Sequence, residues 1–127
     1  MAKIINSMAQ LKKLIGDSEY AVYARWSRGF AKDVKQGSSR DYLSGETHAG
    51  LSAVEVNPAW LSDDAYLARR ITEYIFLRIK DEKIGCHIYE GVEVGIDSDG
   101  YPSITKIEHV ATLSNAFVEK LMAMRGI

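Results

Sequence analysis

Apolar residues recur at helical spacing in three parts of the chain. The spacing predicts a short helix over residues 7–15, a long central helix over residues 62–80 and a closing helix after Ser114. Ser62 and Ser114 are placed to cap the starts of the second and third helices, because a serine side chain accepts from a free backbone N–H.

Between these helices the pattern changes to the alternation that is typical of strands. We expect strands over residues 19–26, 51–56, 84–96 and 102–110. The third contains glycines, so it is either one bent strand or two. The order of the elements predicts an α+β fold, with a mostly antiparallel sheet of about four to five strands, one long central helix and two shorter terminal helices.

Length and composition fit one domain over residues 1–127. Hydrophobic residues make up 46 %, enough for one core, and the formal net charge of -1 gives no nucleic-acid signal. No apolar run is long enough to span a membrane, and the single cysteine, Cys86, suits the core of a cytoplasmic protein. The three histidines lie too far apart in sequence to predict a metal site.

The stretch over residues 27–50 is expected to be a long loop, and long loops in compact domains are often functional. Its first part has a local excess of positive charge. An arginine fork matches phosphate or carboxylate oxygens, and nearby glycines and serines let backbone N–H groups approach an anion. An ordinary solvated basic loop explains the pattern equally well. Between residues 25 and 40 the one acidic residue is Asp33, and the basic residues are Arg25, Arg28, Lys32, Lys35 and Arg40.

Glu90 is the most irregular residue, since it interrupts an apolar strand face. A carboxylate there needs a partner or a shifted pKa. Arg25 or Arg78 would serve as an ion-pair partner, or Glu90 is an acid of a functional site.

Several short motifs resemble those of an uncharacterised family of small bacterial and phage proteins. They are Tyr23-Ala-Arg25-Trp26-Ser27-x-Gly29, Ser39-Arg40-Asp41-x-x-Ser44-Gly45, Gly50-Leu51-Ser52 and Leu67-Ala68-Arg69-Arg70. The resemblance covers residues 20–110. It implies a phage protein that sequesters a host immune signal.

A more distant similarity is to ADP-ribosyltransferases, which place an arginine, a serine and a glutamate on successive strands. Arg25, Ser52 and either Glu90 or Glu93 match that layout. The resemblance implies an enzyme that uses NAD.

Our leading hypothesis is a non-catalytic binding protein for an anionic, nucleotide-like ligand, with no cofactor of its own. The alternatives are the NAD-dependent enzyme and a protein-interaction module that docks an acidic partner through the basic loop; a homodimer fits each of them. The expected ligand-binding residues are Tyr23, Arg25, Trp26, Ser27, Arg28, Ser39, Arg40, Asp41, His48 and Ser52, with Trp60 as a further stacking residue.

Overall fold

The computed structural model describes residues 2–40, 47–97 and 99–126, and for residues 38–40 and 47–49 it describes the backbone alone. The chain adopts the α+β fold that the sequence predicts. Within the described residues there are a six-stranded mixed sheet, a two-stranded sheet and five α-helices.

The main sheet has the strand order β1-β8-β7-β2-β6, with β5 also pairing with β8. Its centre is a long antiparallel hairpin of two twelve-residue strands. The prediction of a mostly antiparallel sheet holds except at one edge, where β1 runs parallel to β8. The strands are β1 (Lys3–Ile5), β2 (Val22–Ser27), β5 (Leu51–Ser52), β6 (Val54–Glu55), β7 (Gly85–Ile96) and β8 (Pro102–Leu113).

The expected strand over residues 51–56 instead joins two parts of the sheet. Its first half, β5, pairs with β8, and its second half, β6, pairs with β2. Between them, the Ala53 N–H donates to the Pro102 carbonyl at 3.1 Å. The segment therefore crosses from one strand of the sheet to another, and the sheet curls around the side chains on its inner face.

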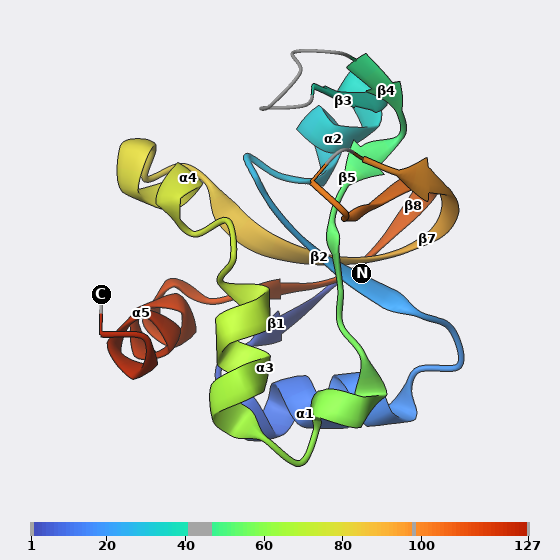
Figure 1. Ribbon diagram of the computed structural model, residues 1–127. Coiled ribbons are helices and arrows are strands. Elements are labelled where there is room, and N and C mark those ends of the chain that lie inside the picture. Colours follow the sequence, from blue (N-terminus) through green and yellow to red (C-terminus); the bar gives the residue numbers. More distant parts are fainter. Residues whose placement is uncertain (1, 41–46, 98, 127) are drawn as a thin grey trace.

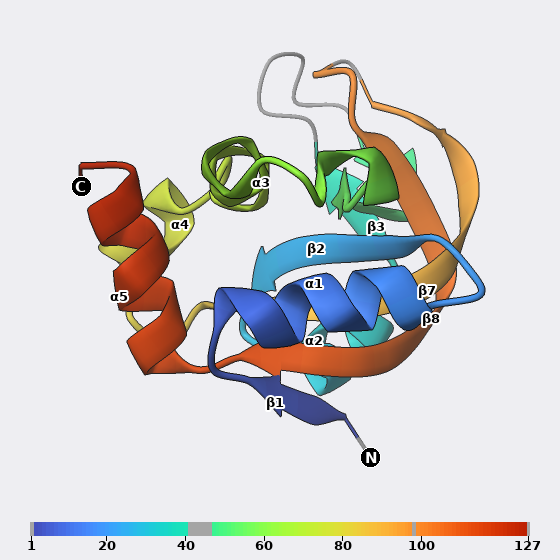
Figure 2. The ribbon, with the colours of Figure 1, turned by 90° about the horizontal axis from the view of Figure 1, so that it is seen from below.

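Helices cover the two faces of this sheet unequally (Figure 1). On one face, α1 (Met8–Asp17), α3 (Asp64–Ile71) and α5 (Asn115–Met124) bury their apolar sides against the sheet in the larger core cluster. Seen from that side, α1 crosses the sheet and α5 stands at one end (Figure 2). On the other face lie α2 (Phe30–Gln36) and the hairpin of β3 (Ser38–Arg40) and β4 (Thr47–Ala49).

The helix predicted over residues 62–80 is two helices, α3 and α4 (Phe76–Lys80), and a 3₁₀ turn, η1 (Pro58–Trp60), precedes them. Asp63, rather than Ser62, caps α3 by accepting from the Tyr66 N–H. The helix ends at Thr72, whose hydroxyl donates to the Ala68 carbonyl at 2.7 Å. Such back-bonding by threonine competes with a straight continuation of the helix.

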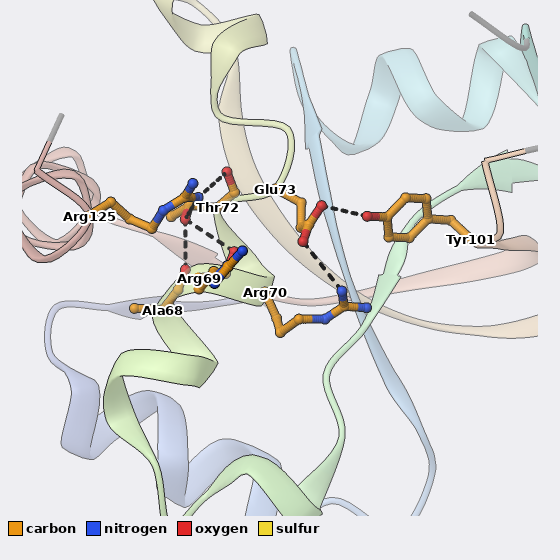
Figure 3. A network of polar contacts seen from close by, with 7 residues as sticks. All are labelled: Ala68, Arg69, Arg70, Thr72, Glu73, Tyr101 and Arg125. Atoms are coloured by element: carbon orange, nitrogen blue, oxygen red, sulfur yellow. Dashed lines mark hydrogen bonds and ion pairs between the residues drawn. The ribbon is translucent and has the colours of Figure 1, made fainter. Parts of the chain in front are cut away.

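Polar contacts hold the end of α3 in place (Figure 3). Arg125, which directly follows α5, donates to the Thr72 hydroxyl at 2.8 Å. Glu73 accepts from Arg70 at 3.3 Å and from the Tyr101 hydroxyl at 2.5 Å. Burial and this hydrogen bond to Glu73 raise the pKa of Tyr101 to about 12. The network ties α3 to α5 and to the turn between β7 and β8.

Candidate functional site

The predicted ligand residues of β2 divide between the two faces of the sheet. Tyr23, Arg25 and Ser27 point to the face covered by α2. Trp26 points to the larger core, where its indole N–H donates to the Ile71 carbonyl at 2.7 Å. The structure therefore does not bring Trp26 together with the other candidates, because alternate residues of a strand face opposite ways.

Asp33 of α2 is the centre of a buried polar network on the α2 face. Its carboxylate is 1 % exposed and accepts from Arg25 Nε at 3.0 Å, from Ser27 Oγ at 2.6 Å and from the Tyr89 hydroxyl. Arg25 also donates to the Ser52 carbonyl at 2.7 Å. The guanidinium of Arg25 is thus neutralised inside the protein, and its role is to fix α2 and β5 on the sheet.

Tyrosines on the same face are held in their neutral form. The Tyr23 hydroxyl donates to Glu93 at 2.8 Å, and burial together with this contact raises its pKa. Burial and the hydrogen bond to Asp33 also raise the pKa of Tyr89. Both hydroxyls therefore act as hydrogen-bond donors at neutral pH.

The arginine–serine–glutamate layout is only partly brought together. Arg25 and Ser52 are neighbours, but the Ser52 hydroxyl donates to Asp97 at 2.6 Å. Glu93 lies on the same face through its bond with Tyr23, whereas Glu90, three residues earlier in β7, pairs with Val22 and faces the opposite side. Glu90 cannot join Arg25 in one site.

Two histidines meet beside α2 on strands β7 and β8. His87 Nδ1 lies 2.9 Å from Thr112 Oγ1, and His109 Nε2 lies 2.7 Å from the same oxygen. His109 Nε2 is also 3.0 Å from the Ala111 carbonyl, which can only accept, so we assign the proton to Nε2. The Thr112 hydroxyl then donates to His87 Nδ1. Burial and the neighbouring His109 lower the pKa of His87.

We call this surface, formed by Phe30, Gly85, His87, His109 and Thr112, the histidine face. The Phe30 ring stacks on His109 with centroids 5.6 Å apart, and both residues remain partly exposed. A side chain added at Gly85 would meet only His87 within 4 Å, so there is open space beside the imidazole. The face offers aromatic surface and hydrogen-bonding groups in one place.

Positive charge flanks the histidine face. Arg28, just before α2, is exposed and forms an ion pair of 2.6 Å with Asp81, which lowers the pKa of that carboxyl. Lys32 and Lys35 are exposed on α2. The side chains of Ser39, Arg40 and His48, and all of Asp41, lie outside the described residues.

Sequence reasoning missed Asp33 and the histidine face. In the sequence Asp33 stands out only as the single acidic residue of a basic stretch, because nothing there predicts a helix. His109 and Thr112 are three residues apart and would face opposite sides of a regular strand. A bulge between the pairs Ile88–Ala111 and Tyr89–His109 brings them together. The only available signal was His87, on the polar side of its strand.

A family of unknown function (DUF6098) matches residues 1–124 of the chain. No curated protein and no solved structure matches. None of the helices in the described part of the chain is long and apolar enough to cross a membrane.

Proposed function

The chain belongs to this family of unknown function, so we propose a function from the geometry of the site alone. We propose that the protein binds an anionic, nucleotide-like ligand on the histidine face. The observation that carries the proposal is the partly exposed stack of Phe30 and His109 beside the exposed Arg28. A base needs a flat aromatic surface, and a phosphate needs a nearby cation.

Each part of the ligand has a matching group in this arrangement. The base packs against Phe30 and His109, and the open space at Gly85 leaves room for the sugar. Arg28, whose own side chain is exposed, exchanges the partly exposed Asp81 for a phosphate, and ion pairs near the surface contribute little. We give Arg25 no direct role, because its guanidinium is already neutralised by the buried Asp33 and is held by the Ser52 carbonyl.

Thermal unfolding against a panel of nucleotides, including NAD, ADP-ribose and cyclic dinucleotides, tests the proposal. A ligand at ~100 times its dissociation constant stabilises by about 2.7 kcal/mol, which is several degrees for a domain of this size. Recovery of the intact ligand after denaturation distinguishes a binder from an NAD-consuming enzyme. A panel without any shift would refute nucleotide binding and favour the acidic-partner alternative.

Matched variants locate the site once a ligand is found. Arg28→Gln should weaken binding roughly tenfold, because it removes a charge-assisted hydrogen bond to the phosphate. His109→Gln should weaken binding by a similar factor, because it removes the ring on which the base packs. Lys120→Gln, at an exposed position of α5, is the control and should bind as the wild type does. Arg40→Ala extends the test to the predicted loop residues outside the described part. If Arg28→Gln and His109→Gln both bind as tightly as Lys120→Gln does, the histidine face is excluded.

A further inference from the structure

A groove of about 560 Å³ lies on the side of the sheet that α1 covers, away from the histidine face. It is bounded by β1, by the second half of α1 and by the segment that leads from α1 to β2. Its volume is in the range of small-molecule sites. We call it the Glu90 groove, defined by Lys3, Ile5, Leu14, Glu19, Tyr20 and Glu90.

Glu90 is the residue of this groove that lacks an explanation within the protein. Its side chain is half-buried on the sheet, and no described residue forms a hydrogen bond or an ion pair with it. Both arginines that the sequence suggested are engaged elsewhere, Arg25 with Asp33 and Arg78 with the Ile84 carbonyl. A half-buried carboxylate without a partner is unfavourable, so the fold keeps it at a cost.

The neighbouring strand increases this cost. Glu90 is paired directly with Glu108 of β8 and, on its other side, with the apolar Val22 of β2. Like charges opposite each other on adjacent strands repel. A cation that enters the groove would reduce the repulsion between Glu90 and Glu108, and it would give Glu90 the partner that it lacks.

We propose that the Glu90 groove binds a protonated aliphatic amine. The amino group would form a charge-assisted hydrogen bond with Glu90, and the alkyl chain would lie along Leu14 and Ile5. Tyr20, which is largely exposed at the groove, adds an aromatic face that attracts cations. Two lysines, Lys3 and Lys13, also line the groove, but neither forms an ion pair with Glu90, and Lys13 is paired with Asp17 at 3.0 Å.

Calorimetric titration with 1,4-diaminobutane tests this site on the whole chain, with 1,4-butanediol as the uncharged analogue. We expect saturable binding of the diamine and none of the diol. Glu90→Gln should weaken the binding of the diamine by about tenfold to a hundredfold, because the variant replaces the charged partner of the amino group by a neutral amide. Tyr20→Ser, at a largely exposed position, should weaken it by a smaller factor.

Glu119→Gln, at an exposed position of α5, is the matched control for the loss of one negative charge and should leave the affinity unchanged. The proposal is overturned if the diamine does not bind, if the diol binds equally, or if Glu90→Gln binds as tightly as Glu119→Gln does. Glu90→Gln should leave nucleotide binding intact, so this site and the histidine face succeed or fail separately.

Discussion

Replacing Asp33 by asparagine tests whether its buried carboxylate holds the α2 face together. The substitution keeps the shape of the side chain but removes the charge, and it turns an amide N–H₂ toward three groups that all donate to position 33. These donors are Arg25 Nε, Ser27 Oγ and the Tyr89 hydroxyl. At least one of them loses its acceptor in the variant.

The expected loss follows from burial. Removing one partner of a buried ion pair costs about 3–5 kcal/mol, because the remaining charge stays buried. The Arg25 side chain is 14 % exposed and keeps its bond to the Ser52 carbonyl, so we expect the lower end, about 3 kcal/mol. For a chain of 127 residues this corresponds to a fall in Tm of about 10 °C.

Urea unfolding, followed by tryptophan fluorescence and by circular dichroism, measures this loss. Asp64→Asn is the matched control: it removes the exposed pair with Lys12 and should cost less than about 1 kcal/mol. Tyr89→Phe combined with Asp33→Asn should be non-additive, since both variants remove the same hydrogen bond. If Asp33→Asn lowers the free energy of unfolding by no more than Asp64→Asn does, the buried carboxylate does not hold the α2 face together.

Three further predictions concern single positions. Gly50→Ala should destabilise the fold by at least about 2 kcal/mol more than Gly37→Ala does, as measured by urea unfolding midpoints. Both glycines have positive φ, but only at Gly50 would an added Cβ lie 2.9 Å from the Ile104 carbonyl oxygen. Burial lowers the pKa of His87 below its usual 6.5. As the pH falls, the His87 imidazole is therefore protonated in the unfolded chain before it is protonated in the folded protein. Stability should therefore be full above about pH 6.5 and fall as the pH drops, and His87→Gln should flatten that fall in unfolding curves measured from pH 7.5 to 5. Cys86 is fully buried and burial raises its pKa, so a thiol reagent should label it only under denaturing conditions; rapid labelling of the native protein would show that the core opens readily.

Elements with a regular pattern could be predicted from the sequence. Ser114 caps α5 as expected, since its side chain accepts from the Phe117 backbone N–H. Tyr23, Arg25, Ser27 and Ser52 were proposed as site residues and do lie together. Their side chains, however, bind acidic residues of the protein itself: Arg25 and Ser27 bind Asp33, Ser52 binds Asp97, and Tyr23 binds Glu93.

The missed elements lack a regular pattern for physical reasons. In α2 the buried position belongs to Asp33 and the apolar Val34 is exposed, so the helix shows no apolar stripe. β1 has only three residues, and it is defined by pairing with β8 rather than by alternation. The bulge that unites His109 with Thr112 depends on pairing between strands, which local spacing does not report.

The pairing of β1 has a consequence for folding during synthesis. Lys3 and Ala111 are partners although more than one hundred residues separate them in the chain. On the ribosome, β1 must therefore wait, unpaired, until almost all of the sheet has emerged, whereas β7 and β8 can form their hairpin locally. A nascent chain halted before β8 would expose the apolar side of α1 and an unsatisfied strand edge, the two features by which chaperones recognise unfinished proteins.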